Sequence, residues 1–284
     1  MFRSARTILT TILTTGLTTG LTAVVTALAV AAPTVPATAG TPAGVVNVAH
    51  RGASGHAPEN TIEALLLAAR QGADMVEFDV RETRDHALIL MHDTTLARTT
   101  DVESVFPGRA PWRVADFTLA EIRELDAGSW FGSSFRGTRV PTLREALRAM
   151  SRTRLGLLVE IKTPRLHPGI ERRAAVELRR SWHGPLVVQS FDWDAMRAFH
   201  RLMPDVPVGL LGTPSPGELR GLAAFAGQIN PPYRDLTRDY VRAVQSLGMR
   251  VFTWTTDDPG VMRRLGSYRV DGILTNRPHV LARL

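Results

Sequence analysis

From Val45 onward, short runs of β-branched and aliphatic residues alternate with longer amphipathic stretches. Nine runs have the length and composition of buried strands, and they cover residues 45–50, 75–80, 87–92, 155–162, 186–191, 206–211, 227–230, 250–255 and 271–275. Helical patterns lie between most of them. A repeated order of strand and helix predicts a parallel sheet covered on both faces, and this number of repeats in about 245 residues predicts a closed (β/α)8 TIM barrel. A doubly wound open sheet is the alternative.

The second and third runs lie too close together for a helical crossover. Only "RETRDH" separates residues 75–80 from residues 87–92, whereas parallel neighbours need a connection of about a dozen residues or more. We therefore expect an antiparallel hairpin with its turn near residues 84–85. The numbers of facing residues should then sum to about 169, which places His92 beside Glu77.

Two pairs of residues have the spacing of a capping box, which predicts a helix start at each. They are Asn60 with Glu63, and Thr142 with Glu145. Residues 94–140 show no clear repeat of strand and helix. We interpret them as a small insertion above the C-terminal face of the barrel, which is the face that holds the active site in such barrels.

The first 39 residues differ in composition from the rest. Two arginines near the start precede an uncharged stretch rich in Thr, Leu, Val and Ala, and Ala37 and Ala39 fit the small-residue pattern of a cleavage site. This arrangement predicts a secretory signal peptide over residues 1–39 and a mature domain over residues 40–284, in a secreted or cell-envelope protein. A transmembrane anchor is the alternative, which two prolines in the segment disfavour. We expect no stable membrane insertion of the mature chain.

The amino-acid composition excludes several kinds of site. Cysteine is absent, which excludes disulfides, thiolate chemistry and a cysteine-ligated zinc site. Removal of the two arginines in the predicted signal lowers the formal net charge from +7 to +5. The positive charge is spread along the chain as arginine, so we do not expect nucleic acid binding. An anionic substrate or a cell-wall polymer is compatible with this charge.

The stretch "VEIKTP" contains the only lysine of the chain. The sequence has 34 Lys and Arg residues, and all except Lys162 are arginine. Solvated surface charge tolerates either residue, but a narrow site that needs a compact ammonium does not accept the wide planar guanidinium. Lys162 is therefore a candidate for a confined functional site, and a chance occurrence is the alternative.

Ionisable residues stand at the ends of two predicted strands. Side chains two positions apart on a strand point the same way, so Glu77 and Asp79 share a face, as do Glu160 and Lys162. Inward-facing positions of a barrel are normally apolar, and burying charge is costly. Three converging carboxylates suit a hard divalent metal, Ca2+ or Mg2+. The alternative is a structural salt bridge from Glu77 or Glu160 to Lys162.

Two histidines also stand at strand ends. His50 and Arg51 follow the first run, and His92 ends the third. Phosphoryl transfer needs a base on the attacking oxygen and an acid on the leaving oxygen, and imidazoles serve both roles near neutral pH. Arg51 can clamp phosphate oxygens, and Lys162 can supply a point charge. We interpret the other histidines as packing or surface residues: His56, His86, His167, His183, His200 and His279.

A series of motifs runs from about residue 47 to the C-terminus: "HRG", "PENT", "GADMVEFDV", "MHDTTLARTTD", "VEIK", "QSF", "FTWT" and "DGILTNRP". Their order and spacing resemble those of the glycerophosphodiester phosphodiesterase family. The resemblance implies a TIM barrel that hydrolyses glycerophosphodiesters to an alcohol and sn-glycerol 3-phosphate with a divalent metal. By the same resemblance, His50 and His92 are the acid and base, Glu77, Asp79 and Glu160 are metal ligands, and Arg51 and Lys162 contact the phosphate.

Several positions allow more than one interpretation. Trp254 forms the floor of a glycerol pocket or is a buried core residue. Glu59 helps to order the site or belongs to a loop before a capped helix, which is the interpretation we favour. Asp257 stands where the family more usually has Asn, and we interpret it as a helix cap. Trp130 and Phe131 are candidates for an apolar rim of the substrate pocket.

These observations together predict an exported metal-dependent phosphodiesterase acting on small glycerophosphodiesters. A phospholipase D-like activity on lysophospholipids and a teichoic acid substrate are alternatives. A secreted protein that binds phosphodiesters without cleaving them is another, but such a protein would be expected to lack a catalytic histidine or a metal ligand, and none is missing. Attack by a glycerol hydroxyl, which gives a cyclic phosphate, and direct attack by water are both compatible with the residues.

Overall fold

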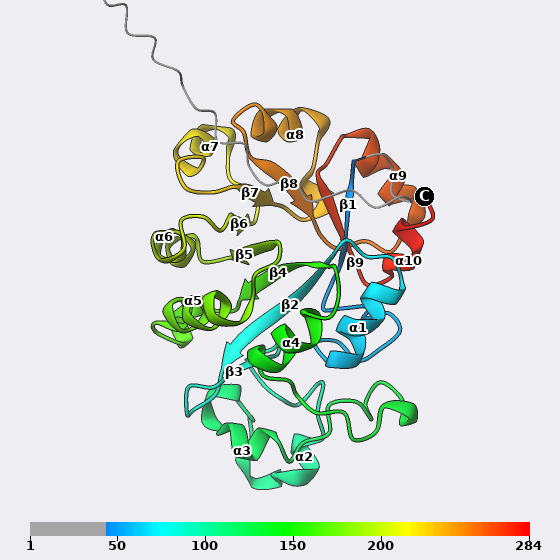
Figure 1. Cartoon of the computed structure of the whole chain (residues 1–284), viewed down its shortest axis with the longest axis vertical. Helices are drawn as coiled ribbons and strands as arrows, with labels where there is room; N and C mark the ends of the chain where they lie inside the picture. Colours follow the sequence, from blue (N-terminus) through cyan, green and yellow to red (C-terminus); the bar gives the residue numbers. More distant parts are fainter. Residues whose placement is uncertain (1–43) are drawn as a thin grey trace, which may run out of the picture. The chain divides into compact units, whose positions relative to one another are not determined.

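Eight parallel strands form a closed barrel in a computed structural model of the chain, which describes residues 44–284 (Figure 1). The predicted signal peptide and its cleavage site lie outside the described residues. The strands are β1 (Val46–Ala49), β2 (Met75–Glu82), β4 (Gly156–Ile161), β5 (Leu186–Ser190), β6 (Val208–Leu211), β7 (Gln228–Asn230), β8 (Arg250–Thr253) and β9 (Gly272–Thr275). Their hydrogen-bonded order is β1-β9-β8-β7-β6-β5-β4-β2, and pairing of β1 with β2 closes the ring. The TIM barrel is thus confirmed, and the open doubly wound sheet is wrong.

Helices surround the barrel and follow the strands as the sequence pattern predicts. They are α1 (Ile62–Arg70), α4 (Leu143–Met150), α5 (Ile170–Ser181), α6 (Trp193–Leu202), α7 (Pro216–Leu222), α8 (Arg238–Gln245), α9 (Pro259–Ser267) and α10 (Pro278–Leu281). The capping box of Thr142 and Glu145 is confirmed at the start of α4. The box predicted at Asn60 is wrong, because the neighbouring Thr61 caps α1. Within residues 44–284, no helix is long and apolar enough to cross a membrane.

Alternating strand side chains build two apolar layers. Val159 and Ile161 of β4 point outward and belong to the large buried cluster shared with the helices. The inward-facing residues form a second cluster inside the barrel: Val46, Val48, Met75, Leu158, Val187, Phe252 and Leu274. Burial of each such large side chain contributes about 1.5–3 kcal/mol. The same alternation turns Glu160, two positions after the inward-facing Leu158, toward the barrel interior.

The antiparallel hairpin of β2 with β3 (Leu88–Leu90) is present, but its predicted register is wrong by one residue. Val80 faces Leu90, one position further along β3 than expected. The turn is one residue longer than the pattern suggested, and within it His86 takes a left-handed conformation with φ 64°. Since β3 ends before His92, the predicted pairing of His92 with Glu77 across the ladder is also wrong. A one-residue slip of this kind exchanges the faces of the strand.

The segment between β3 and α4 forms the insertion. In Figure 1 it lies at the lower end of the view, beyond the head of the β2 arrow. It contains the short helices α2 (Val102–Val105) and α3 (Leu119–Ile122), and 3-10 turns at Pro107–Arg109, Val114–Asp116 and Ser133–Phe135. A separate apolar cluster that includes Leu96, Phe117 and Leu125 packs these pieces together. The insertion therefore has a core of its own beside the carboxyl end of β2.

Candidate active site

Three carboxylates meet at the carboxyl ends of two neighbouring strands. Glu77 and Asp79 lie on β2, and Glu160 lies on β4 directly opposite Asp79. All three are buried, and each offers an oxygen that lies within 4.8 Å of the others. Lys162 follows β4 and places Nζ 2.7 Å from Glu160 Oε1 and 3.6 Å from Asp79 Oδ1. The structure thus brings the predicted metal-ligand set and the single lysine together.

The carboxylates repel one another in this buried place. Burial raises the pKa of Glu77 well above its ordinary value, and the charges of Asp79 and Glu160 add to the shift. Burial and the charge of Asp79 raise the pKa of Glu160 to about 7. Burial also acts to raise the pKa of Asp79, but Lys162 and Arg51 outweigh it, and the net shift is downward. Without a cation, proton uptake by Glu77 and Glu160 is what relieves the repulsion.

This donor set fits a hard divalent cation. Among residues 44–284, the ligand atoms grouped here are all carboxylate oxygens, which Ca2+ and Mg2+ prefer. The buried Oδ1 of Asp79 has no hydrogen-bond partner, so it has capacity left for a ligand. Lys162 and Arg51 together do not balance three carboxylates, and Arg51 also pairs with Glu59. A structural salt bridge alone therefore does not account for the cluster.

Arg51 connects the first strand to the carboxylates. It follows β1 in a left-handed conformation with φ 56°, and its backbone N–H donates to Glu77 Oε2 at 2.7 Å. Its Nη1 donates to Glu59 Oε1 at 2.9 Å, and its Nε lies 3.4 Å from Asp79 Oδ2. Glu59 lies in the loop before the capped helix α1, as the favoured interpretation has it, and through Arg51 it also helps to order the site.

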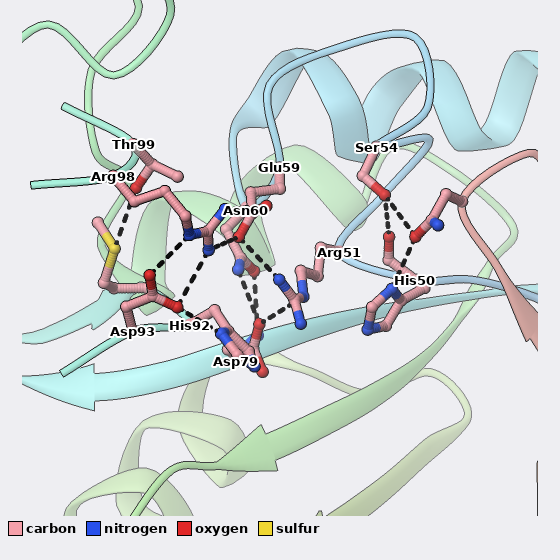
Figure 2. A network of polar contacts seen from close by, with 12 residues as sticks. His50, Arg51, Ser54, Glu59, Asn60, Asp79, His92, Asp93, Arg98 and Thr99 are labelled. Atoms are coloured by element: carbon pink, nitrogen blue, oxygen red, sulfur yellow. Dashed lines mark hydrogen bonds and ion pairs between the residues drawn. The ribbon is translucent and has the colours of Figure 1, made fainter. Parts of the chain in front are cut away.

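His92 is held through both its ring and its backbone. Its Nδ1 lies 2.6 Å from Asp93 Oδ1 (Figure 2). Its carbonyl oxygen accepts from Arg81 Nη2 at 2.7 Å. Arg98 of the insertion donates to Asp93 Oδ2 at 2.6 Å and to Glu59 Oε1 at 2.7 Å. Burial lowers the pKa of His92. The ring is therefore neutral near neutral pH. The guanidinium of Arg98 connects Asp93, which binds the ring, to Glu59.

His50 follows the end of β1, and its ring Nδ1 lies 2.8 Å from Asn276 Oδ1. Burial lowers the pKa of His50 to about 4, and the positive charge of Arg51 acts in the same direction. This imidazole is therefore also neutral near neutral pH. Because an oxygen engages Nδ1 in both His50 and His92, Nε2 is the nitrogen left for a substrate in each ring.

A cavity of about 120 Å³ lies beside the carboxylates. It is lined by His50, Arg51, Glu77, His92, Glu160, Lys162, Gln189, Phe191, Leu211, Trp254 and Leu274. It shares His92, Glu160, Lys162 and Phe191 with a wider cleft of about 800 Å³. Trp254 donates from Nε1 to Asn230 O at 2.8 Å, and its ring centroid lies 5.8 Å from that of Phe191. Trp254 belongs to the cavity wall, whereas Trp130 and Phe131 line neither space.

The sequence matches the family model described as the glycerophosphoryl diester phosphodiesterase family over residues 50–280. The chain belongs to this family. A glycerophosphodiester phosphodiesterase of Caldanaerobacter subterraneus is 35% identical over 242 residues, which is 84% of this chain and 96% of that relative. One of Bacillus subtilis is 34% identical over 259 residues, which is 84% of this chain and 85% of the relative. The solved structure of an Oleispira antarctica phosphodiesterase in complex with the product sn-glycerol-3-phosphate is 30% identical, with a TM-score of 0.75 over 82% of this chain and 94% of that one.

This membership makes the protein an enzyme, a phosphoric diester hydrolase with glycerophosphodiester phosphodiesterase activity. The alternative of a binding protein without activity is set aside.

The sequence motifs located the charged residues of the family site, but they did not reveal the amides that support them. Asn60, with φ 58°, donates from Nδ2 to Asp79 Oδ2 at 2.8 Å and accepts from Asp79 N at 3.0 Å. Gln189 lines the cavity and accepts from Asn230 Nδ2 at 2.7 Å. The sequence could have indicated Gln189, because it stands two positions after the inward-facing Val187 and so also points into the barrel.

We expect Gly52→Ala to damage both the stability and the activity of this phosphodiesterase. Gly52 has φ 81°, and a Cβ there would lie 2.5 Å from the backbone carbon of Ala64 in α1. The backbone of α1 cannot give way, so the turn that aims His50 and Arg51 must shift. The free energy of unfolding should fall by more than about 1 kcal/mol, and kcat should fall with it. Urea unfolding and the rate of glycerol 3-phosphate release measure the two effects.

Gly137→Ala is the matched control for that substitution. Gly137 has a similar φ of 85°, but nothing lies within 4 Å of the added Cβ. This variant therefore carries the backbone strain without the steric clash, and it should keep its kcat. If both variants lost activity equally, the close approach of Gly52 to α1 would not be the cause.

Proposed function

We propose that this family member is an exported, divalent-metal-dependent enzyme that hydrolyses glycerophosphodiesters to an alcohol and sn-glycerol 3-phosphate, with His50 and His92 as acid and base. The proposal rests on the observation that these two histidines line one cavity together with Arg51, Lys162, Glu77 and Glu160. Cleavage of a phosphodiester needs a proton removed from the attacking oxygen and another given to the leaving oxygen. A neutral imidazole can remove the first proton, whereas the imidazole that gives the second must carry a proton while the substrate is bound. Water and a glycerol hydroxyl are both compatible as the attacking group.

Glu77, Asp79 and Glu160 are the residues that would hold the metal, and their oxygen ligands favour Ca2+ or Mg2+. When bound, the cation supplies positive charge that offsets carboxylate repulsion and the charge of the phosphate. The chain adds two positive groups of its own. Arg51 and Lys162 both line the cavity, where they attract the phosphodiester and orient it.

We place the glycerol phosphate in the smaller cavity beside Trp254 and the alcohol in the wider cleft. The complex of the Oleispira antarctica relative with sn-glycerol-3-phosphate supports a glycerol phosphate site in this fold. The lining of the wider cleft includes Asp93, Arg165 and Asp192 as well as Phe191. Charges of both signs suit a polar alcohol better than the acyl chain of a lysophospholipid. Small glycerophosphodiesters are therefore the substrates proposed, ahead of lysophospholipid and teichoic acid.

The test is a comparison of substrates with the purified, metal-stripped protein. Glycerophosphocholine, a lysophospholipid and a glycerol phosphate polymer of the teichoic acid type are each incubated with Ca2+, Mg2+ or EDTA. We expect metal-restored release of choline and glycerol 3-phosphate from the first. Equal rates with EDTA would overturn metal dependence. Faster cleavage of the lysophospholipid or the polymer would overturn the assignment of the substrate class.

Lys162→Arg should lower kcat/KM by about 10- to 100-fold, which corresponds to the ~1.5–3 kcal/mol of a hydrogen bond to a charged group. Lys162 lies between Glu160 and Asp79 with a side chain that is 11% exposed, so a planar guanidinium does not fit without displacing them. Steady-state kinetics measures the loss. The reciprocal change Arg201→Lys on the exposed surface of α6 is the control. Wild-type kcat/KM in Lys162→Arg would show that the shape of lysine is irrelevant.

Export is inferred from the sequence of residues 1–39. Expression in a bacterial host should deliver the protein to the envelope or the medium with Gly40 as its first residue. Fractionation followed by N-terminal sequencing measures both properties. An intact N-terminus in the membrane fraction would instead support the anchor, and an intact N-terminus in the cytoplasm would contradict export.

A further inference from the structure

Asp257 lies in the loop between β8 and α9, but it does not cap the helix. The cap is its neighbour Asp258, whose side chain accepts from Val261 N. The interpretation of Asp257 as a helix cap is therefore wrong. Its Oδ1 accepts from Thr275 Oγ1 and from Asn276 N, both at 2.8 Å, and its Oδ2 accepts from Asn276 Nδ2 at 2.9 Å. The carboxylate of Asp257 is thus directed at Asn276, the partner of His50.

These contacts fix which way the Asn276 amide points. An ionised carboxylate only accepts hydrogen bonds, so the end of the amide that faces Asp257 must be NH2. The other end, the carbonyl Oδ1, then faces His50 Nδ1 at 2.8 Å. Ser54 Oγ also lies 3.0 Å from Asn276 Oδ1 and 2.7 Å from His50 O. The one hydrogen of the Ser54 hydroxyl serves either of these two carbonyl oxygens, whereas the Asp257 carboxylate cannot donate and therefore decides the orientation of the amide.

The amide orientation in turn fixes the proton of His50. A carbonyl oxygen cannot donate, so His50 Nδ1 must carry the hydrogen. The Nε2 atom of a neutral ring then bears the lone pair. We propose that Asp257 is a positioning residue, which acts through Asn276 to hold His50 in the Nδ1–H tautomer with Nε2 free to accept a proton. Its catalytic consequence rests on the proposed function, in which His50 takes part in acid and base catalysis.

An isosteric substitution gives a sharp test of this chain of contacts. In Asp257→Asn, the new side chain must keep its oxygen toward Asn276 N–H, because an NH2 cannot accept that hydrogen bond. Its own NH2 then faces the NH2 of Asn276, and two donors repel. Rotation of the Asn276 amide removes the clash but turns NH2 toward His50 Nδ1, which must then accept. The expected result is the Nε2–H tautomer of His50.

The exchange of both residues should restore the native tautomer. In the double variant Asp257→Asn with Asn276→Asp, the carboxylate at position 276 accepts from the new amide at position 257. Its other oxygen accepts from His50 Nδ1–H. The two residues together keep their charge and their size. If Asp257 had a purely structural role, the tautomer of His50 would not depend on whether position 257 or position 276 carries the amide.

The measurement is the tautomer of His50 in the full-length protein labelled with 15N-histidine. Long-range 1H–15N correlations report the tautomer of each imidazole. The signals of His50 are identified by their loss in the variant His50→Gln. Nδ1–H is expected in the wild type and the double variant, and Nε2–H in Asp257→Asn. With glycerophosphocholine and metal, kcat should fall on the order of 10²-fold in Asp257→Asn with little change in KM, and recover in the double variant. Asp258→Asn is the control, because Asn caps a helix as well as Asp, and it should change neither the tautomer nor kcat.

The outcomes separate this inference from the proposed function. An unchanged tautomer in Asp257→Asn would overturn the inference, and so would the same change in Asp258→Asn. Inversion of the tautomer that the double variant reverses would establish Asp257 as a positioning residue. If that inversion left kcat unchanged, the positioning would stand and the acid–base role of His50 would fail.

Discussion

His92→Ala should lower kcat by about 10²- to 10⁴-fold, the usual contribution of a general acid or base, while cation binding is retained. His92 lies on the wall shared by the small cavity and the wider cleft. Asp93 engages its Nδ1 at 2.6 Å, which leaves Nε2 for proton transfer. Burial lowers the pKa of His92, and an anionic phosphate bound nearby raises the pKa of an imidazole. The ring is thus neutral before the substrate binds and can take a proton once it has bound.

The measurement combines steady-state kinetics with a titration of Ca2+ or Mg2+ into the variant. None of the candidate ligands is a histidine, so the affinity for the cation should change little. His183→Ala, at an exposed position before β5, is the matched control and should keep its kcat. Turnover near the wild-type rate in His92→Ala would rule out its acid–base role. Loss of cation binding together with activity would mean that the effect is structural.

The hydrophobic pattern was sufficient for the barrel but not for its details. Strand side chains alternate with a period of two, so the runs of Val, Ile and Leu mark buried strands on their own. The same period predicted that Glu77, Asp79 and Glu160 share the interior. The register of the hairpin was missed because it depends on the turn, where His86 adopts φ 64°. The hydrophobic pattern carries no information about the backbone conformation of a turn residue.

Partners that reach the site from loops were the hardest to predict. Asn60 and Thr61 are both good N-cap residues, and only the tertiary fold shows that Thr61 caps α1 while Asn60 binds Asp79. Arg98 is one of many arginines in the sequence, and its contact to Glu59 joins residues 39 positions apart in the chain. Such contacts depend on how loops fold over the barrel mouth, which local sequence does not determine.

Two adjacent aspartates in the loop after β8 are a further case in which the local sequence does not determine the contact. Asp257 and Asp258 have identical chemistry, and either could cap α9 from its position in the sequence. The structure gives the cap to Asp258 and directs Asp257 to Asn276. The loop after β8 reaches Asn276 because Asn276 follows β9, which lies beside β8 in the barrel. Strand order therefore explains why this loop supports His50, which the local sequence does not show.

A divalent cation should raise the melting temperature more at about pH 8 than at about pH 5.5, because the free carboxylates repel one another most when ionised. Burial raises the pKa of Glu160 from 4.5 to about 7 and that of Glu77 well above its ordinary value. Between the ordinary and the raised pKa, the folded cation-free protein binds more protons than the unfolded chain does. Its stability therefore falls as the pH rises through this window. A cation replaces those protons, so its effect is largest above the window.

Thermal unfolding at the two pH values, with EDTA or with excess Ca2+ or Mg2+, measures this effect. At a concentration 100 times Kd the cation contributes about 2.7 kcal/mol, which corresponds to a rise of about 5 to 10 °C at the higher pH. Glu160→Gln removes one of the repelling charges, so it should raise the melting temperature in EDTA at the higher pH while it abolishes the response to the cation and the activity. Glu63→Gln at an exposed position of α1 is the control. Equal cation responses at both pH values, or a full response in Glu160→Gln, would show that these carboxylates do not form the cation site.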